Sequence, residues 1–145
     1  MEDNDLGGTI LGCAMNVHTV LGPGLLESTY EACLVHEFSK AGLTVARQVA
    51  LPVRYDGIEL EAAYRIDLIV NDLVILELKV VDQLLPIHNA QLLSYLKLSH
   101  RRLGYLLNFN VVHMRDGIKR IVNNFSLFLR FSSASSASSA VRVNL

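Results

Sequence analysis

Two carboxylates and a lysine stand out in the apolar segment from residue 67 to residue 79. Asp67 opens this segment, Glu77 lies ten positions later, and Lys79 follows after one leucine. Residues 73–81 (LVILELKVV) contain no Gly or Pro and are rich in Leu, Ile and Val, which is typical of a strand buried on both faces. Side chains two positions apart in a strand point to the same side, so Glu77 and Lys79 share a face. Burying such charges costs free energy unless they are paired or bind a metal.

These groups suit a hard divalent cation. Asp67 and Glu77 would bind the ion through oxygen, and the backbone carbonyl of Leu78 is a candidate third ligand. Two carboxylates about 4 Å apart repel each other by roughly 4 kcal/mol at an effective dielectric constant of about 20, and a cation removes that penalty. Mg²⁺ keeps several waters, one of which can become the nucleophile. Lys79 could orient that water, help to deprotonate it, or stabilise the charge on a phosphorane-like transition state.

The register of the strands decides whether the two carboxylates meet. With a strict two-residue turn at residues 71–72, Asp67 would lie opposite Leu76, and Glu77 would point to the other side of the sheet. A shared metal site requires a three-residue loop (71–73), a bulge or a strong twist. We expect one of these three.

Two further segments could reach the same place. Glu27 would share the face of a predicted helix with Tyr30 or Glu31. Gln91 and Tyr95 are four positions apart in another predicted helix and also share a face. Gln91 could hydrogen-bond a scissile phosphate or a metal-bound water, and Tyr95 could do the same or stack on a base.

The elements that must position these residues form a mixed α/β domain in the order ααβββαβ. Apolar periodicity and turn residues predict helices over residues 6–20 and 25–40, strands over 43–55, 61–70 and 73–81, a helix over 86–100, and a strand over 104–110. Residues 118–122 could form a fifth strand or begin a helix. Arg47 and Gln48 are expected on a solvated face of the first strand.

The composition fits one domain. The chain has 145 residues, 51% of them hydrophobic, and a formal net charge of −1. This charge argues against a protein that binds nucleic acid over its whole surface, but it is compatible with a local basic cleft. Two separated cysteines, no secretory signal and no apolar run of membrane-spanning length predict a cytoplasmic protein that does not associate with membranes. Residues 1–125 would form the domain, and the Ser/Ala-rich residues 126–145 a disordered tail.

Several ordered motifs resemble one family over roughly residues 8–123. The string GLLESTY at 24–30 matches the signature that names the GxxExxY proteins. Further strings are similar to that family: VH at 17–18, LGPG at 21–24, RQV at 47–49, YRIDLIV at 64–70, ILELK at 75–79 and AQLLSYL at 90–96. The family is placed in the PD-(D/E)XK nuclease superfamily. The resemblance implies a single-domain fold of the α/β class, with an αβββαβ core and a mixed central sheet.

The resemblance also implies roles for the charged residues. Asp67 and Glu77 would bind the metal, and Lys79 would assist catalysis. Glu27 would be the acidic residue of the first core helix that supports the metal or a water. Ile66 stands where the name of the superfamily has proline, a residue that is often absent there.

Two polar side chains and a histidine extend the predicted site. Gln91 with Tyr95 is similar to the Q-x-x-x-Y motif of RecB-type nuclease domains. In those domains a histidine can also bind the metal, which makes His18 a further candidate ligand. A helix-end or packing role is the alternative for His18.

The sequence therefore predicts a phosphodiesterase that depends on Mg²⁺ or Mn²⁺ and acts on DNA rather than RNA. A homodimer or a partner could supply substrate selection. The alternative is a catalytically silent nucleic-acid-binding or scaffold protein that retains the nuclease fold. The intact Asp67, Glu77 and Lys79 favour the enzyme, whereas the short and nearly neutral chain favours the binding protein.

Overall fold

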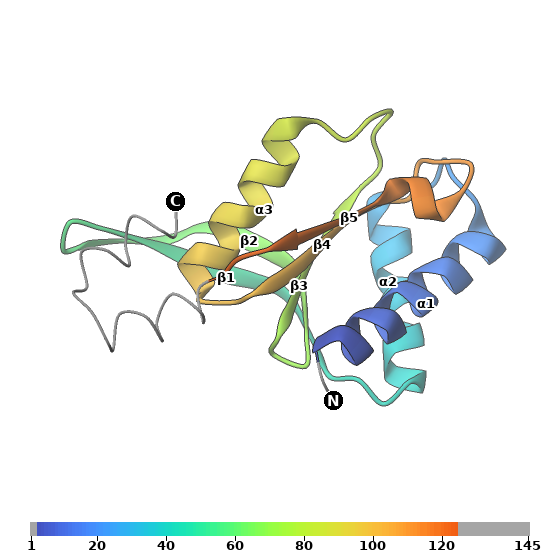
Figure 1. Ribbon diagram of the computed structural model, residues 1–145, viewed down its shortest axis with the longest axis horizontal. Coiled ribbons are helices and arrows are strands. Elements are labelled where there is room, and N and C mark those ends of the chain that lie inside the picture. Colours follow the sequence, from blue (N-terminus) through green and yellow to red (C-terminus); the bar gives the residue numbers. More distant parts are fainter. Residues whose placement is uncertain (1–2, 125–145) are drawn as a thin grey trace.

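The computed structural model describes residues 3–124, which form a mixed α/β domain (Figure 1). The elements are α1 (Asp3–Leu21), α2 (Glu27–Lys40), β1 (Val45–Tyr55), β2 (Ile58–Val70), β3 (Val74–Lys79), α3 (Pro86–Ser99), β4 (Leu103–Asn108), the 3₁₀ helix η1 (Met114–Gly117) and β5 (Ile118–Val122). The predicted αβββαβ core is confirmed, and residues 118–122 are a strand. The predicted tail, residues 126–145, lies outside the described residues. Within residues 3–124, no helix is long and apolar enough to cross a membrane.

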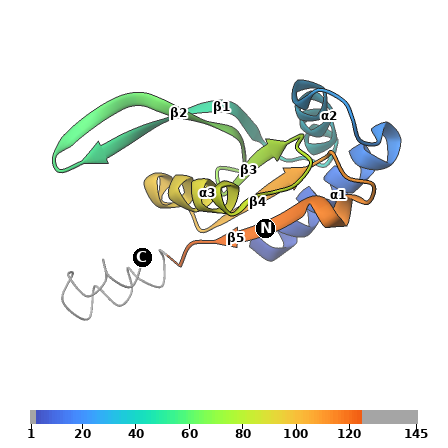
Figure 2. The same ribbon diagram turned by 90° about the horizontal axis from the view of Figure 1, so that it is seen from above.

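The sheet is mixed, as predicted, and has helices on both faces. Its strand order is β1-β2-β3-β4-β5, with β3 and β4 parallel and the other neighbours antiparallel. The crossover from β3 to β4 contains α3, which covers one face, while α1 and α2 cover the other (Figures 1 and 2). Residues of β3 alternate between the two layers: Leu76 and Leu78 pack under α1 and α2, and Ile75 packs under α3. A central strand buried on both faces is therefore present where the sequence predicts it.

The loop between β2 and β3 has three residues, 71–73. Val70 pairs with Val74, so the register places Leu68 opposite Leu76. Of the three arrangements expected (a three-residue loop, a bulge or a strong twist), the structure has the three-residue loop. It shifts the pairing by one residue from that of a two-residue turn, and this shift brings the next position of β2, Asp67, to the level of Glu77.

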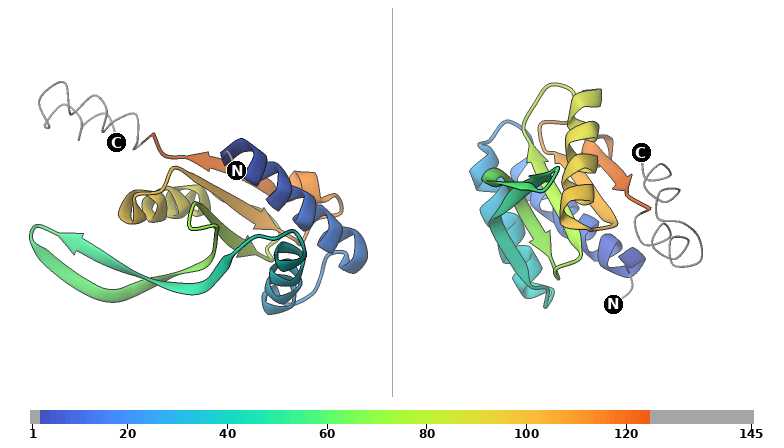
Figure 3. Two further views of the ribbon diagram at one scale, coloured as in Figure 1. Left: turned by 90° about the horizontal axis from the view of Figure 1, so that it is seen from below. Right: turned by 90° about the vertical axis from the view of Figure 1, so that its left-hand side faces the viewer.

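The hairpin of β1 and β2 extends well beyond β3. β2 pairs with β3 only over residues 68–70, whereas it pairs with β1 as far as Ile58. The outer part, residues 51–64, which we call the arm, projects alongside α3 (Figures 2 and 3). Asp56 and Gly57 at its tip both have positive φ, as a two-residue hairpin turn requires. A register shift between Leu51 and Val53 makes the arm irregular.

Tyr30 fixes the turn that leads into α2. Its side chain is fully buried and stacks on Phe109, with ring centroids 4.4 Å apart. The hydroxyl donates to the carbonyl of Gly22 (2.6 Å) and accepts from the N–H of Leu25 (3.1 Å). The tyrosine of GLLESTY therefore has a structural role, and it ties the Gly-Pro-Gly turn to the core.

We expect Tyr30→Phe to lower the free energy of unfolding by about 1–2 kcal/mol. The substitution keeps the stacked ring but removes the part-buried hydrogen bonds to the Gly22 carbonyl and from the Leu25 N–H. Urea denaturation of the purified protein measures this change. Tyr55→Phe is the matched control, because Tyr55 is 72% exposed at the tip of the arm and should change stability by less than about 0.5 kcal/mol. Equal stability of the wild type and Tyr30→Phe would contradict this role.

Candidate active site

The two predicted carboxylates meet where β2 parts from β3, a place that we call the fork. The pair Leu68 and Leu76 is the last one in the ladder. At the next position the N–H of Asp67 donates to Oε2 of Glu77 (2.8 Å), and the N–H of Leu78 donates to Oδ2 of Asp67 (2.8 Å). These two bonds replace backbone pairing, so a backbone N–H fixes one oxygen of each carboxylate.

Both carboxylates at the fork lie in surroundings that disfavour their ionised forms. Glu77 is only 5% exposed, and burial, followed by the charge of Asp67, raises its pKa to about 8. Burial also raises the pKa of Asp67, and the charge of Glu31 adds to this, while the hydrogen bond from Leu78 opposes it. Burial therefore disfavours ionisation of both carboxyl groups at the fork.

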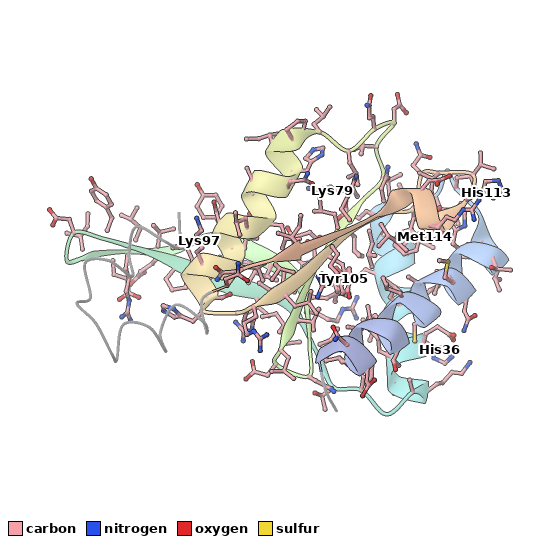
Figure 4. All side chains as sticks on the ribbon, viewed as in Figure 1. His36, Lys79, Lys97, Tyr105, His113 and Met114 are labelled. Atoms are coloured by element: carbon pink, nitrogen blue, oxygen red, sulfur yellow. The ribbon has the colours of Figure 1, made fainter. Side chains whose placement is uncertain are left out.

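Lys79 supplies positive charge at the same site. It ends β3 and follows Glu77 by two positions, so the strand directs both side chains to one side. Its charge lowers the pKa of both Asp67 and Glu77, although burial outweighs this effect. Figure 4 shows Lys79 where the chain leaves β3 for α3. The structure thus brings together the aspartate, glutamate and lysine that the sequence analysis selects.

Glu27 lies at the margin of this group. It is the first residue of α2 and is exposed. Partial burial and then the charge of Asp67 raise the pKa of its carboxyl group, and the charge of Lys79 lowers it. Glu27 is therefore close enough to interact electrostatically with the fork.

Glu31 is an acidic residue whose importance the sequence analysis missed. It lies one turn after Glu27, is buried, and accepts hydrogen bonds from Arg47 Nε (3.1 Å), Arg47 Nη2 (2.9 Å) and Gln48 Nε2 (2.8 Å). Arg47 and Gln48 are exposed, as a solvated strand face predicts, but they also bind this carboxylate. Gln48 additionally hydrogen-bonds Asp67. Glu31 and Gln48 therefore connect α2, through β1, to the fork.

Tyr95 of α3 faces the fork from the opposite layer. It is buried, and burial followed by the charge of Glu77 raises the pKa of its phenol, with smaller contributions from Tyr64 and Asp67. Gln91 is half-buried one turn earlier in the same helix. The predicted helix face therefore reaches the site through Tyr95, with Gln91 beside it.

His18 lies elsewhere in the fold. Its Nε2 is 2.7 Å from the carbonyl oxygen of Val111, and its ring packs near Phe109 with centroids 6.5 Å apart. Among the residues that the structure describes, no three or more His, Cys, Asp or Glu side chains form a group that could hold a metal ion. Neither His18 nor Glu27 therefore completes a set of three side-chain ligands with Asp67 and Glu77.

The donor set at the fork nevertheless fits Mg²⁺ or Mn²⁺. Mg²⁺ is commonly bound by one or two carboxylates while waters and substrate oxygens fill its other positions. Asp67 and Glu77 supply two carboxylates whose pKa values are raised chiefly by burial, so a bound cation would favour their ionised forms. The carbonyl of Leu78 stays a predicted third ligand.

Comparison with known proteins gives one match. The family model described as the PD-(D/E)XK nuclease superfamily matches residues 4–121, which is most of the chain. No curated protein and no solved structure matches. The matched range contains every residue of the fork and both helices that face it.

In EDTA, we expect the free energy of unfolding to fall as the pH rises from about 5 to about 8. The ordinary pKa of a glutamate is 4.5, whereas that of folded Glu77 is about 8. Between these values the folded protein binds more protons than the unfolded chain, so stability decreases with rising pH. Urea denaturation at a series of pH values measures this slope.

Glu77→Gln is the control for this pH dependence. The amide cannot titrate, so the variant should show a flatter dependence than the wild type. Mg²⁺ or Mn²⁺ should stabilise the wild type more at pH 8 than at pH 6, because protons compete with the cation at the lower pH. Identical slopes for the two proteins would contradict the raised pKa of Glu77.

Proposed function

Because this chain belongs to the PD-(D/E)XK nuclease superfamily, we propose that it is a divalent-metal-dependent nuclease that hydrolyses phosphodiester bonds in DNA. Membership supports nuclease chemistry and binding of nucleic acid. The observation that carries the proposal is the fork itself, where reciprocal hydrogen bonds hold Asp67 and Glu77 together beside Lys79. The proposal goes beyond family membership in two points: the dependence on a metal, and DNA rather than RNA as the substrate.

Asp67 and Glu77 would hold the ion, which is Mg²⁺ or Mn²⁺. When bound, such an ion polarises a phosphate and lowers the pKa of a bound water. Lys79 would lie beside the reacting phosphate, where its ammonium group can hydrogen-bond the attacking water or stabilise negative charge as it develops on the phosphate oxygens. The half-buried position of Lys79 strengthens these interactions relative to bulk water.

The flanking residues would position the reactants. A raised pKa keeps the Tyr95 phenol protonated, so it can donate a hydrogen bond to a phosphate oxygen. Gln91, one turn away, can donate from its amide. Glu27 can accept a hydrogen bond from a water at the exposed margin. Glu31 acts through Gln48 on Asp67 and is a positioning residue.

Other parts of the sequence-based prediction stay proposals. These are the assignment to the GxxExxY proteins, a homodimer and a cytoplasmic location. None of them alters the chemistry assigned to the fork.

Purified protein should cleave DNA oligonucleotides with Mg²⁺ or Mn²⁺, and EDTA should stop the reaction. Asp67→Asn, Glu77→Gln and Lys79→Met should each lower the rate at least about 100-fold, because each removes a ligand charge or a group that stabilises the transition state. A panel of single-stranded, nicked, branched and duplex DNA, together with RNA, measures the preference. Glu59→Gln and Lys119→Met are matched controls on exposed residues and should retain full activity.

Cleavage that persists in both Glu77→Gln and Lys79→Met would mean that this site does not perform the reaction. Preferential cleavage of RNA would change the substrate class. Titration with Mn²⁺ by calorimetry separates the enzyme from a silent binding protein: the wild type should bind the ion, and Asp67→Ala should lose that binding. DNA binding without metal binding or cleavage would support the silent alternative.

A further inference from the structure

Tyr64 lies on β2 three residues before Asp67, on the side of the hairpin that faces α3. Its register partner is Leu51, which is buried in the same apolar layer as Tyr95. The rings of Tyr64 and Tyr95 are 5.9 Å apart between centroids and inclined by 48°. Tyr64 is 48% exposed, so one part of it contacts Tyr95 while the rest is open to solvent.

The position of Tyr64 relative to the fork suits a nucleotide. At the rise of a β-strand, three residues separate its Cα atom from that of Asp67 by roughly 10 Å. A phosphate held at the fork would therefore place an adjoining base within reach of the exposed ring. Tyr95 contacts the Tyr64 ring from α3 and also interacts electrostatically with Glu77 and Asp67 at the fork.

The arm beyond Tyr64 is apolar on this face and acidic overall. Leu60 and Ile58 are exposed, and their register partners are Val53 and Tyr55. Residues 51–64 contain one arginine and three acidic residues, a net charge of −2, and the arginine pairs with Glu59. Such a surface cannot neutralise the phosphates of a duplex, but it can contact uncharged bases.

We propose that Tyr64 is a base-stacking residue and that this protein acts on nucleotides whose bases are unpaired, in single strands or frayed ends. The inference rests on the proposed nuclease function and specifies its substrate. Stacking of a base on an aromatic side chain contributes about 1–3 kcal/mol and does not depend on sequence. A paired base inside a duplex presents no free face to the ring, so the selection is for unpaired nucleotides.

The test compares Tyr64→Ala, Tyr64→Phe and Val20→Ala with the wild type. Cleavage of a single-stranded oligonucleotide and of the matching hairpin duplex is measured with Mg²⁺ present. The wild type should favour the single strand, and Tyr64→Ala should raise the KM for it about 5- to 100-fold with a smaller change in kcat. Tyr64→Phe keeps the ring and should behave like the wild type. Val20→Ala truncates an exposed apolar side chain of α1, outside the arm and the fork, and should also retain activity.

Two outcomes would overturn the inference while nuclease activity stands. One is equal cleavage of duplex and single strand by the wild type, with no effect of Tyr64→Ala. The other is conversion of a dimer to a monomer by Tyr64→Ala in analytical ultracentrifugation, with the preference for single strands unchanged, which would make this face an interface between copies. Circular dichroism verifies that the variants fold.

A wild type that cleaves no nucleic acid would count against the proposed function, and binding then decides the inference separately. Fluorescence anisotropy of a labelled single-stranded oligonucleotide measures that binding. Weaker binding by Tyr64→Ala but not by Tyr64→Phe supports stacking. Equal binding by the wild type and Tyr64→Ala overturns it.

Discussion

The hydrogen bonds that join Asp67 to Glu77 and to Leu78 are the constraint on which the rest of the structure depends. Buried backbone N–H groups must be bonded, and strands in a sheet normally bond one another. At the fork the carboxylates accept from the N–H groups of Asp67 and Leu78 instead. β2 can therefore leave β3 without leaving unpaired N–H groups inside the protein. The arm and the candidate active site both result from this separation of the two strands.

The turn before α2, α2 itself and β1 support the fork through a series of contacts. Tyr30 ties the turn before α2 to the core, and α2 then presents Glu31 to Arg47 and Gln48. Gln48 adopts a positive φ of 49° at the position of β1 opposite Asp67, a conformation that costs free energy for a residue other than glycine. Its hydrogen bonds to Glu31 and Asp67 offset that cost. The strained residue is thus part of the connection between α2 and the site.

The sequence predicts the parts of this arrangement that depend on local patterns. The apolar run around Glu77 identifies the central strand. The parity of strand positions requires a three-residue loop, a bulge or a strong twist, and the structure has the loop. The contacts of Glu31 join residues 16 and 17 positions apart and depend on the bend of β1, so periodicity could not reveal them. The role of Tyr30 depends likewise on Phe109, which only the folded chain brings near.

The charges around the fork connect the raised pKa of Glu77 with the proposed chemistry. Glu27, Glu31, Asp67 and Glu77 supply four negative charges when all are ionised, and Lys79 and Arg47 supply two positive ones, which leaves −2. A phosphodiester is itself an anion and would be repelled by this balance. A proton on Glu77 relieves the excess in part, as its pKa of about 8 indicates, whereas one divalent cation cancels it. Under the proposed chemistry, a proton and a metal ion would therefore compete for the Glu77 carboxylate, and the metal ion would allow a phosphate to bind beside it.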